Sequence, residues 1–296
     1  MDKILNLFTQ PLACTEDYYR AMRLALFTAM RNGTLAEFES EIGKNLPKCE
    51  IAVANSETLA VQIAQDYEIT APDLPENSIA VITVEGGIYP YISYRIEQLV
   101  KTANANPNIN GILFFVNTPG GYVHRVDITS EVIAMSEKPT AVYATGMCCS
   151  AGMFMFCGAG RIFAASELDR FGSIGTMTTF SDDRKFWEEN GFVDTDIYAT
   201  LSTKKNYNSR EAEKGNFEPI RDSLDIFNQA FHQAISTRRG ITIDPESDVF
   251  NGADFLAVQA MQLGLIDEIS DFDTALNWVV MEGMKWKADS MTTGNS

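Results

Sequence analysis

The sequence predicts an α/β protein built on a largely parallel sheet. From Ile79 onward, short β-branched runs alternate with stretches of helical periodicity, a pattern typical of βαβ units. The chain has 296 residues, 45% hydrophobic and 21% charged, so it is long enough to bury a sizeable core. We expect a main domain over residues 77–288, a helical arm and linker over 1–76, and a disordered tail over 289–296.

The predicted arm consists of two helices. An apolar residue recurs every four positions from Tyr18 to Met30, which indicates a helix with one buried face. Asn32 and Gly33 supply a stop signal, and a second helical segment is expected over residues 35–42. Two prolines and scattered acids between residues 56 and 77 then indicate the connection to the main domain.

The main domain contains five predicted strands and several helices. The strands are expected at residues 79–84, 111–116, 140–145, 161–165 and 176–180. A long helix is predicted from about Ser209 to Arg239, because apolar residues form one stripe at steps of three and four. A last helix is expected from Thr274 to Lys287.

Three glycine-containing turns follow the predicted strands, and they suggest catalytic chemistry. They are residues 85–87 (Glu-Gly-Gly), 117–121 (Asn-Thr-Pro-Gly-Gly) and 146–152 (Gly-Met-Cys-Cys-Ser-Ala-Gly). A strand, a Gly-Gly turn and a helix start leave backbone N–H groups free at one place, which suits an oxyanion hole. Ser150 in the third turn is the candidate nucleophile. Taken alone, a Gly-Gly turn is more often a tight loop, and a serine at a helix start is more often an N-cap.

A nucleophilic serine needs a base, and the chain offers histidines or lysines. His124 follows the second turn closely, whereas His232 lies within the long predicted helix, and neither completes a Ser/His/Asp pattern. Lys204 and Lys205 are the other candidates. A lysine acts as a base only when neutral, so its pKa must fall by about three units, at a cost of about 4 to 5 kcal/mol.

The charge balance excludes several classes of partner. The chain carries 23 Lys and Arg against 40 Asp and Glu, a formal net charge of −17, which disfavours nucleic acid and anionic membranes. No apolar run is long enough to span a membrane, and the N-terminus lacks a secretory pattern, so a cytoplasmic protein is expected. The five cysteines show no metal-ligand spacing, and we expect reduced thiols, no metal and no cofactor.

From about Ile79 to Leu276 the chain resembles the signal peptide peptidase family, including its cytoplasmic phage and prophage branch of head-maturation or capsid-assembly proteases. The resemblance depends on several motifs that occur in the family's order. They are Gly86-Gly87, residues 117–121, Ser150-Ala151-Gly152, residues 161–164 (Arg-Ile-Phe-Ala) with 172–175 (Gly-Ser-Ile-Gly), Phe250-Asn251-Gly252, and residues 260–269.

The resemblance implies a Clp/crotonase-like fold, with repeated ββα-type units, and a serine peptidase that cleaves an extended polypeptide bound by strand addition. It implies a homo-oligomer, and a capsid or scaffold protein as the substrate. The residues that match the family's functional positions are Ser150 as nucleophile, Lys205 (alternatively Lys204) as base, Gly120, Gly121 and Ala151 as oxyanion donors, and Gly86, Gly87, Gly172 and Ser173 as substrate contacts.

Three departures from the family pattern leave rival interpretations open. Ala151 replaces a more usual glycine, Cys148 and Cys149 replace small residues, and the lysine motif lacks its common glycines. One rival is a catalytically silent assembly scaffold that has lost its base. The other is a crotonase-type acyl-CoA enzyme, which would need paired carboxylates near the oxyanion turns and a basic surface for the CoA phosphates.

Overall fold

Strand β5 (Ile109–Thr118) lies in the middle of the sheet. Its apolar run is almost entirely buried, as expected for a parallel strand covered on both faces. It pairs in parallel with β4 (Ser78–Glu85) on one side and β7 (Thr140–Cys149) on the other. The computed structural model describes residues 12–42, 46–54, 61–64, 68–182, 184–193 and 195–293.

The main sheet is mixed, with a parallel centre and antiparallel edges. Its strand order is β10 (Asp254–Leu256), β9 (Arg170–Gly172), β7, β5, β4, β2 (Lys48–Ala54) and β3 (Val61–Ala64). Strand β8 (Arg161–Ala164) pairs with β7 and also with β11 (Glu268–Ile269). The carboxyl ends of β4, β5 and β7 therefore meet at one edge, which is where the predicted glycine turns lie.

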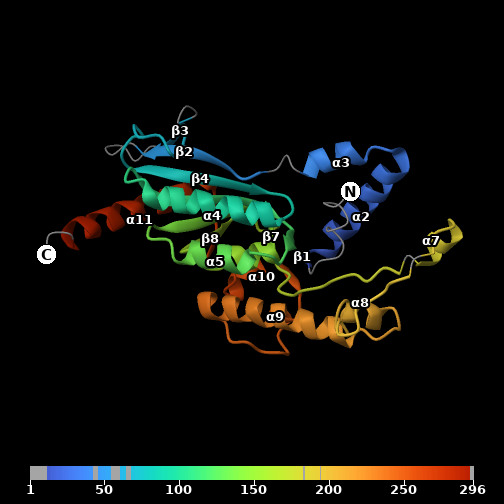
Figure 1. Cartoon of the computed structure of the whole chain (residues 1–296). Coiled ribbons are helices and arrows are strands. Elements are labelled where there is room, and N and C mark those ends of the chain that lie inside the picture. Colours follow the sequence, from blue (N-terminus) through green and yellow to red (C-terminus); the bar gives the residue numbers. More distant parts are fainter. Residues whose placement is uncertain are drawn as a thin grey trace.

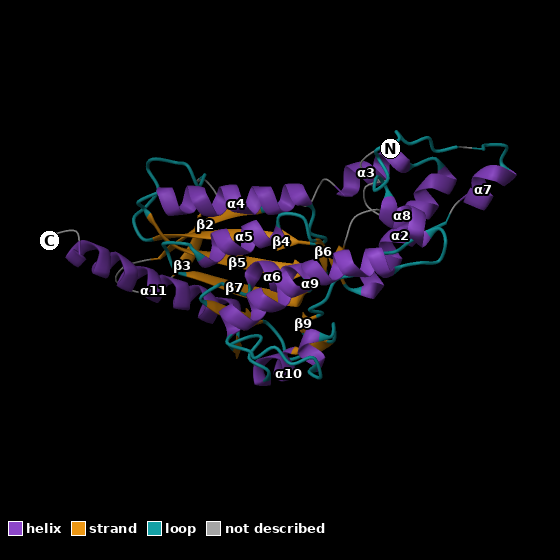
Figure 2. Ribbon diagram, turned by 60° about the horizontal axis from the view of Figure 1, so that its bottom comes forward, coloured by secondary structure: helices purple, strands orange, loops and turns teal. Residues whose placement is uncertain are grey.

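Helices cover both faces of this sheet (Figures 1 and 2). One face packs against α4 (Pro90–Ala105), α5 (Val126–Ala134) and α6 (Ala151–Phe156), and α9 (Glu218–Arg239) lies outside α6. The opposite face packs against α11 (Phe272–Thr293). Two short elements, η1 (Asp248–Phe250) and α10 (Ala257–Gln262), complete the side next to β9. This arrangement is the predicted α/β class, a largely parallel sheet flanked by helices.

The N-terminal helices lie beyond the carboxyl ends of the strands, at the same end of the molecule as α7 (Arg184–Glu189) and α8 (Tyr207–Ala212) (Figure 1). Helix α2 (Glu16–Asn32) ends at Gly33, whose φ of 71° lets the chain turn. Helix α3 (Leu35–Ile42) follows. Ahead of α2, strand β1 (Leu12–Cys14) pairs with β6 (Gly120–Tyr122) in a small separate sheet.

Four details of the structure differ from the sequence prediction. Residues 1–76 are not a purely helical arm, because β2 pairs with β4 and β3 pairs with β2, which extends the main sheet. The helix predicted from Ser209 is two helices, since Gly215 adopts a φ of 82° and Pro219 starts α9. Residues 176–180 form no strand beyond one bridge at Met177.

The fourth difference concerns the C-terminus. Helix α11 continues to Thr293, so residues 289–293 are helical rather than disordered, and residues 294–296 lie outside the described part. Within the described ranges, none of the helices combines the length and the apolar character that crossing a bilayer requires.

Candidate active site

Ser150 occupies the corner between β7 and α6. Its backbone has φ 53° and ψ −118°, a conformation that costs a non-glycine residue on the order of 1–3 kcal/mol. Its amide donates to Gly172 O at 2.7 Å, and its carbonyl accepts from the Phe154 amide at 3.0 Å. The surrounding structure thus holds the serine in a strained turn, as in other nucleophile corners between a strand and a helix.

The side chain of Ser150 is buried, with 1% of the residue exposed, and its Oγ makes no hydrogen bond within the described part of the chain. Buried hydroxyls are nearly always paired, so this one needs an explanation, and a catalytic role is one. Helix α6 is buried along its whole length, and Phe154 stacks on Phe231 of α9 with ring centroids 4.7 Å apart. This packing fixes the corner from the helix side.

Gly120 brings the second predicted turn against this corner. Its φ is 98°, and a Cβ placed on it would lie 2.9 Å from Ser150 Cβ and 3.0 Å from Ala151 N. Only glycine fits both the conformation and the space. The structure therefore places three of the predicted site residues, Gly120, Ser150 and Ala151, in direct proximity.

The backbone amides near Ser150 are not all free to receive an oxyanion. Gly120 N donates to Thr118 Oγ1 at 3.2 Å, and the Thr118 hydroxyl donates to Gly86 O at 2.7 Å. Ala151 begins α6, where the first N–H groups lack partners within the helix. The Thr118 hydroxyl thus links the first predicted turn to the second and competes for the Gly120 amide.

Gly87 and Gly121 lie so close to other atoms that a Cβ would clash at either position. A Cβ on Gly121 would lie 2.0 Å from Ile88 O, and one on Gly87 would lie 2.2 Å from the hydroxyl of Tyr18. Gly121 therefore packs against the chain that follows the first turn. Gly87 is covered by the N-terminal arm.

Gly172 supports the catalytic corner, and Ser173 follows it. Gly172, with a φ of 103°, provides the carbonyl that accepts from the Ser150 amide. Ser173 also has a positive φ, 53°, and donates its amide to Ala253 O at 2.7 Å. These bonds hold residues 172 and 173 beside Ser150, while their predicted contact with substrate stays a prediction.

The two candidate lysines do not contact Ser150 in this structure. Both lie exposed on the turn before α8, and Lys204 Nζ sits 3.8 Å from the centroid of the Tyr207 ring. Since Ser150 Oγ has no hydrogen-bond partner, neither lysine is bonded to it. The structure thus brings Ser150 against Gly120 but does not place either candidate lysine in contact with it.

The two histidines also lie apart from the serine hydroxyl. His124 is exposed on the turn before α5. His232 is half-buried on α9, with its ring edge-on to Phe250 at 5.1 Å. Burial lowers the pKa of His232, and the backbone at Ile174 and Phe250 opposes this in part. His232 is therefore neutral near pH 7 and forms part of the packing under the segment after Ser173.

The cysteines before Ser150 are core residues, as the sequence suggests. Burial raises the pKa of the Cys149 thiol to about 12 and that of Cys148 well above its ordinary value. Cys149 Sγ donates to Arg170 O at 3.4 Å. Both thiols stay protonated and unreactive near neutral pH, so neither competes with Ser150 as nucleophile.

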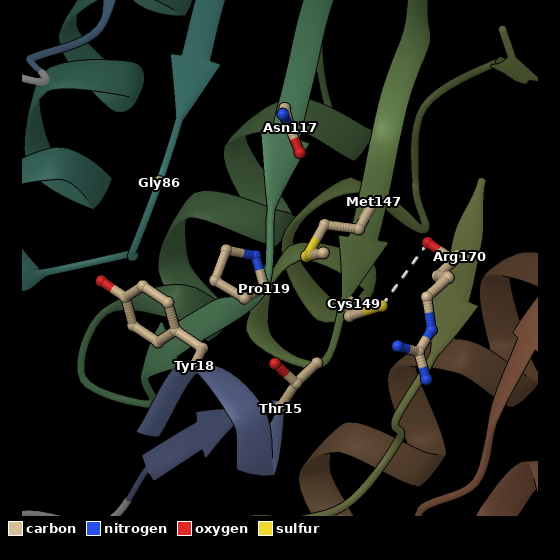
Figure 3. A pocket seen from close by; sticks show the side chains of 8 residues that line it. All are labelled: Thr15, Tyr18, Gly86, Asn117, Pro119, Met147, Cys149 and Arg170. Carbon is tan, nitrogen blue, oxygen red and sulfur yellow. Dashed lines mark hydrogen bonds between the residues drawn. The ribbon is translucent and has the colours of Figure 1, made fainter. Parts of the chain in front are cut away.

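A pocket of about 400 Å³ opens beside the corner (Figure 3). Pro119 and Cys149, the neighbours of Gly120 and Ser150, form part of its wall, and Thr15 and Tyr18 of the arm close another side. The remaining lining residues are Gly86, Asn117, Met147 and Arg170. Nothing in the sequence indicates that Thr15 and Tyr18 reach the site, because the periodicity of this segment predicts only an amphipathic helix.

The topology and the site together are those of a Clp-type fold: a sheet with a parallel centre, whose strand ends hold a strained serine and a glycine turn against each other. The chain belongs to peptidase family S49, whose model matches residues 132–285, while the Clp protease model matches residues 77–165. These matches confirm the family resemblance and identify a peptidase fold.

Three curated proteins similar to this chain have protease names. The capsid assembly protease C of Escherichia phage lambda is 26% identical over 290 residues, covering 91% of this chain. The protease 4 proteins of Haemophilus influenzae and Salmonella typhi are 26% and 24% identical over 72% and 71% of it. The chain spans 63% of the phage protein's length and 37% and 35% of the two bacterial proteins.

Proposed function

We propose that this protein is a serine endopeptidase with Ser150 as its nucleophile. The observation that carries the proposal is the buried, unpaired hydroxyl of Ser150, held in a strained corner with Gly120 packed against it. Ser150 attacks the scissile carbonyl, and the amides of Gly120, Gly121 and Ala151 stabilise the oxyanion. The Gly120 amide takes this role by exchanging its long bond to Thr118 for the stronger charged acceptor.

The base in this proposal is Lys205, with Lys204 as the alternative. It takes the proton of the Ser150 hydroxyl and returns it to the leaving amine. Because both lysines are exposed here, a lysine can reach Ser150 in one of two ways. Either the turn at 200–206 moves onto the site, or a second copy of the chain supplies the lysine. Either route would remove the ammonium from water, which is what lowers a lysine pKa.

The proposed substrate is an extended polypeptide that adds as a strand at β6. The phage relative is named a capsid assembly protease, which supports a capsid or scaffold protein as the substrate. We also propose that the protein works in the cytoplasm as a homo-oligomer, and that Gly86, Gly87, Gly172 and Ser173 line the path of the substrate.

A second candidate is a scaffold of the same fold without catalysis. The exposed position of Lys204 and Lys205 favours it, because a serine without a base is a poor nucleophile. The acyl-CoA interpretation gains no support, since the matched families are peptidases.

Hydrolysis of fluorescein-labelled casein by the wild type and the Ser150→Ala variant distinguishes these candidates. The peptidase proposal expects cleavage by the wild type and none by the variant, with equal melting temperatures. Cleavage by Ser150→Ala would show that another residue is the nucleophile. A wild type that neither cleaves casein nor reacts with a fluorophosphonate would favour the scaffold.

A further inference from the structure

The strand that carries the predicted oxyanion donors already has a partner. Strand β1 runs antiparallel to β6, with Leu12 opposite Tyr122, Ala13 opposite Gly121 and Cys14 opposite Gly120. The Thr15 amide extends the pairing by donating to Pro119 O at 3.0 Å. Because facing backbone groups alternate along an antiparallel ladder, Ala13 and Gly121 form the next facing pair after Thr15 and Pro119.

This pairing brings a peptide carbonyl of the arm next to the nucleophile. A Cβ on Gly120 would lie 2.2 Å from Ala13 O and 2.9 Å from Ser150 Cβ, so both groups border the same small space. Ala13 and Ser150 are each 1% exposed. The arm therefore occupies the position in which a substrate strand would approach Ser150, and it shields the serine from solvent.

Aromatic packing holds the arm in this position. The Tyr18 hydroxyl lies over Gly87, and the Tyr89 hydroxyl donates to Met22 Sδ at 3.6 Å. The Tyr89 ring in turn lies 5.6 Å from that of Tyr122 on β6, centroid to centroid. Tyr19, Met22 and Leu26 of α2 are buried at this contact. The arm is thus anchored on both chain segments that flank the site.

We propose that β1 is an intramolecular inhibitor that occupies the substrate-binding edge of β6 and must leave before a polypeptide can bind. This inference rests on the proposed peptidase function. The arm is built as an occupant rather than a substrate, because on the C-terminal side of β1 the extended chain ends at Thr15 and α2 begins at Glu16. A cleavable peptide needs extended chain on both sides of the scissile bond.

The bound arm should lower the apparent affinity of the protein for an added peptide. An occupant tethered to the same chain competes at a high effective concentration. The apparent affinity for an added peptide is then the intrinsic affinity reduced by the fraction of molecules whose arm is open. Weakening the arm contact therefore raises peptide affinity by the factor by which the open fraction rises.

The test compares two alanine-to-aspartate changes in the full chain. Ala13→Asp places a charge in the buried contact with β6, whereas Ala25→Asp places the same charge on the exposed side of α2. Binding of a fluorescein-labelled peptide with the sequence of residues 12–19 is measured by anisotropy on a Ser150→Ala background, so that chemistry plays no part. Casein hydrolysis is measured in parallel with Ser150 intact.

The expected result is at least tenfold tighter peptide binding by Ala13→Asp than by Ala25→Asp, and a matching rise in casein hydrolysis. Equal binding by the two variants overturns the inhibitor proposal, whatever the hydrolysis shows. If Ala13→Asp binds the peptide more tightly than Ala25→Asp but no protein hydrolyses casein, the peptidase function is overturned and β1 remains an occupant of the peptide site. Wild-type chains that lose residues up to Ala13 or Cys14 on incubation would make β1 a substrate and overturn the inhibitor.

A second variant keeps the test decisive if Ala13→Asp does not fold. Thr15 has φ −65° and no capping bond from its side chain, so Thr15→Pro fits the backbone and removes the amide that donates to Pro119, together with the Thr15 side chain at the pocket wall. Peptide binding should tighten in this variant as well, by a smaller factor. No change from wild type in a folded Thr15→Pro protein counts against the proposal.

Discussion

Gly120 packs directly against Ser150, so closely that a Cβ on the glycine would lie 2.9 Å from the serine Cβ. The two residues come from different strand ends, and their contact is what converts two ordinary turns into a candidate catalytic corner. The positive φ of Gly120 and the strained φ of Ser150 are both needed for this approach.

Gly120→Ala should therefore disrupt the site as well as the fold. We expect a loss of about 2 to 4 kcal/mol in the free energy of unfolding, from backbone strain and overpacking, and loss of fluorophosphonate labelling. Gly191→Ala is the matched control, because Gly191 has a φ of 82° with no atom within 4 Å of its Cβ position. The control should lose about 1 kcal/mol and keep its labelling. Equal losses in both variants would mean that neither Ser150 Cβ nor the nearer Ala13 O, 2.2 Å from the Cβ position, restricts residue 120.

Lys205→Ala should reduce casein hydrolysis by a factor of about 100 to 10,000, the usual contribution of a general base. Its melting temperature should stay unchanged, because the side chain is exposed. Lys204→Ala tests the alternative, and Lys285→Ala on α11 is the control for removal of an exposed charge. Wild-type rates in both single variants at 204 and 205 would exclude a lysine base from this turn.

Mixing two inactive proteins shows whether the lysine that reaches Ser150 comes from the same chain or from a second copy. If a second copy supplies the lysine, Ser150→Ala and Lys205→Ala chains should regain activity when mixed. If the turn at 200–206 moves within one chain, the mixture should stay inactive.

Phe231→Ala should destabilise the protein by about 3 to 5 kcal/mol, since the residue is fully buried and stacks on Phe154 of α6. Phe227→Ala on the same helix, where the side chain is 38% exposed, should cost about 1 kcal/mol or less. Urea unfolding of both variants measures the difference. Similar costs would contradict the role of α9 as the support behind the catalytic corner.

His232 should make stability depend on pH below neutrality. Burial lowers its pKa below the ordinary 6.5, so between these two values the unfolded chain binds more protons than the folded one. Stability therefore falls as the pH drops through 6.5 toward the lower folded pKa. His232→Gln should flatten this slope in thermal melts relative to the wild type. Identical slopes in the two proteins would contradict the buried neutral state.

The sequence was most informative where local rules and long-range structure agree. Both arm helices, the strands β4, β5, β7 and β8 and the corner at Ser150 follow from apolar periodicity and glycine positions. Strands β2 and β3 were missed because their place in the sheet depends on tertiary contacts, the pairing of β2 with β4 and of β3 with β2. The break at Gly215 was missed because the apolar stripe begins only at Ile220 and does not indicate where the helix starts.

The site could be predicted only in part for the same reason. Ser150, Gly120 and Ala151 meet because the carboxyl ends of parallel strands share one edge, which is readable from strand order. The pairing of Ala13 with Gly121 joins segments with no shared pattern, so nothing in the sequence indicates it. The position of the lysines depends on the irregular segment between α7 and α8, which has no periodicity to read.

The most direct test of the central claim is the site of modification by a fluorophosphonate, found by intact mass and peptide mapping. One fluorophosphonate adduct per chain is expected, on Ser150. It should form faster in Ala13→Asp than in the wild type and should be absent from Ser150→Ala. An adduct on another residue, or no adduct on either the wild type or Ala13→Asp, would contradict the central claim.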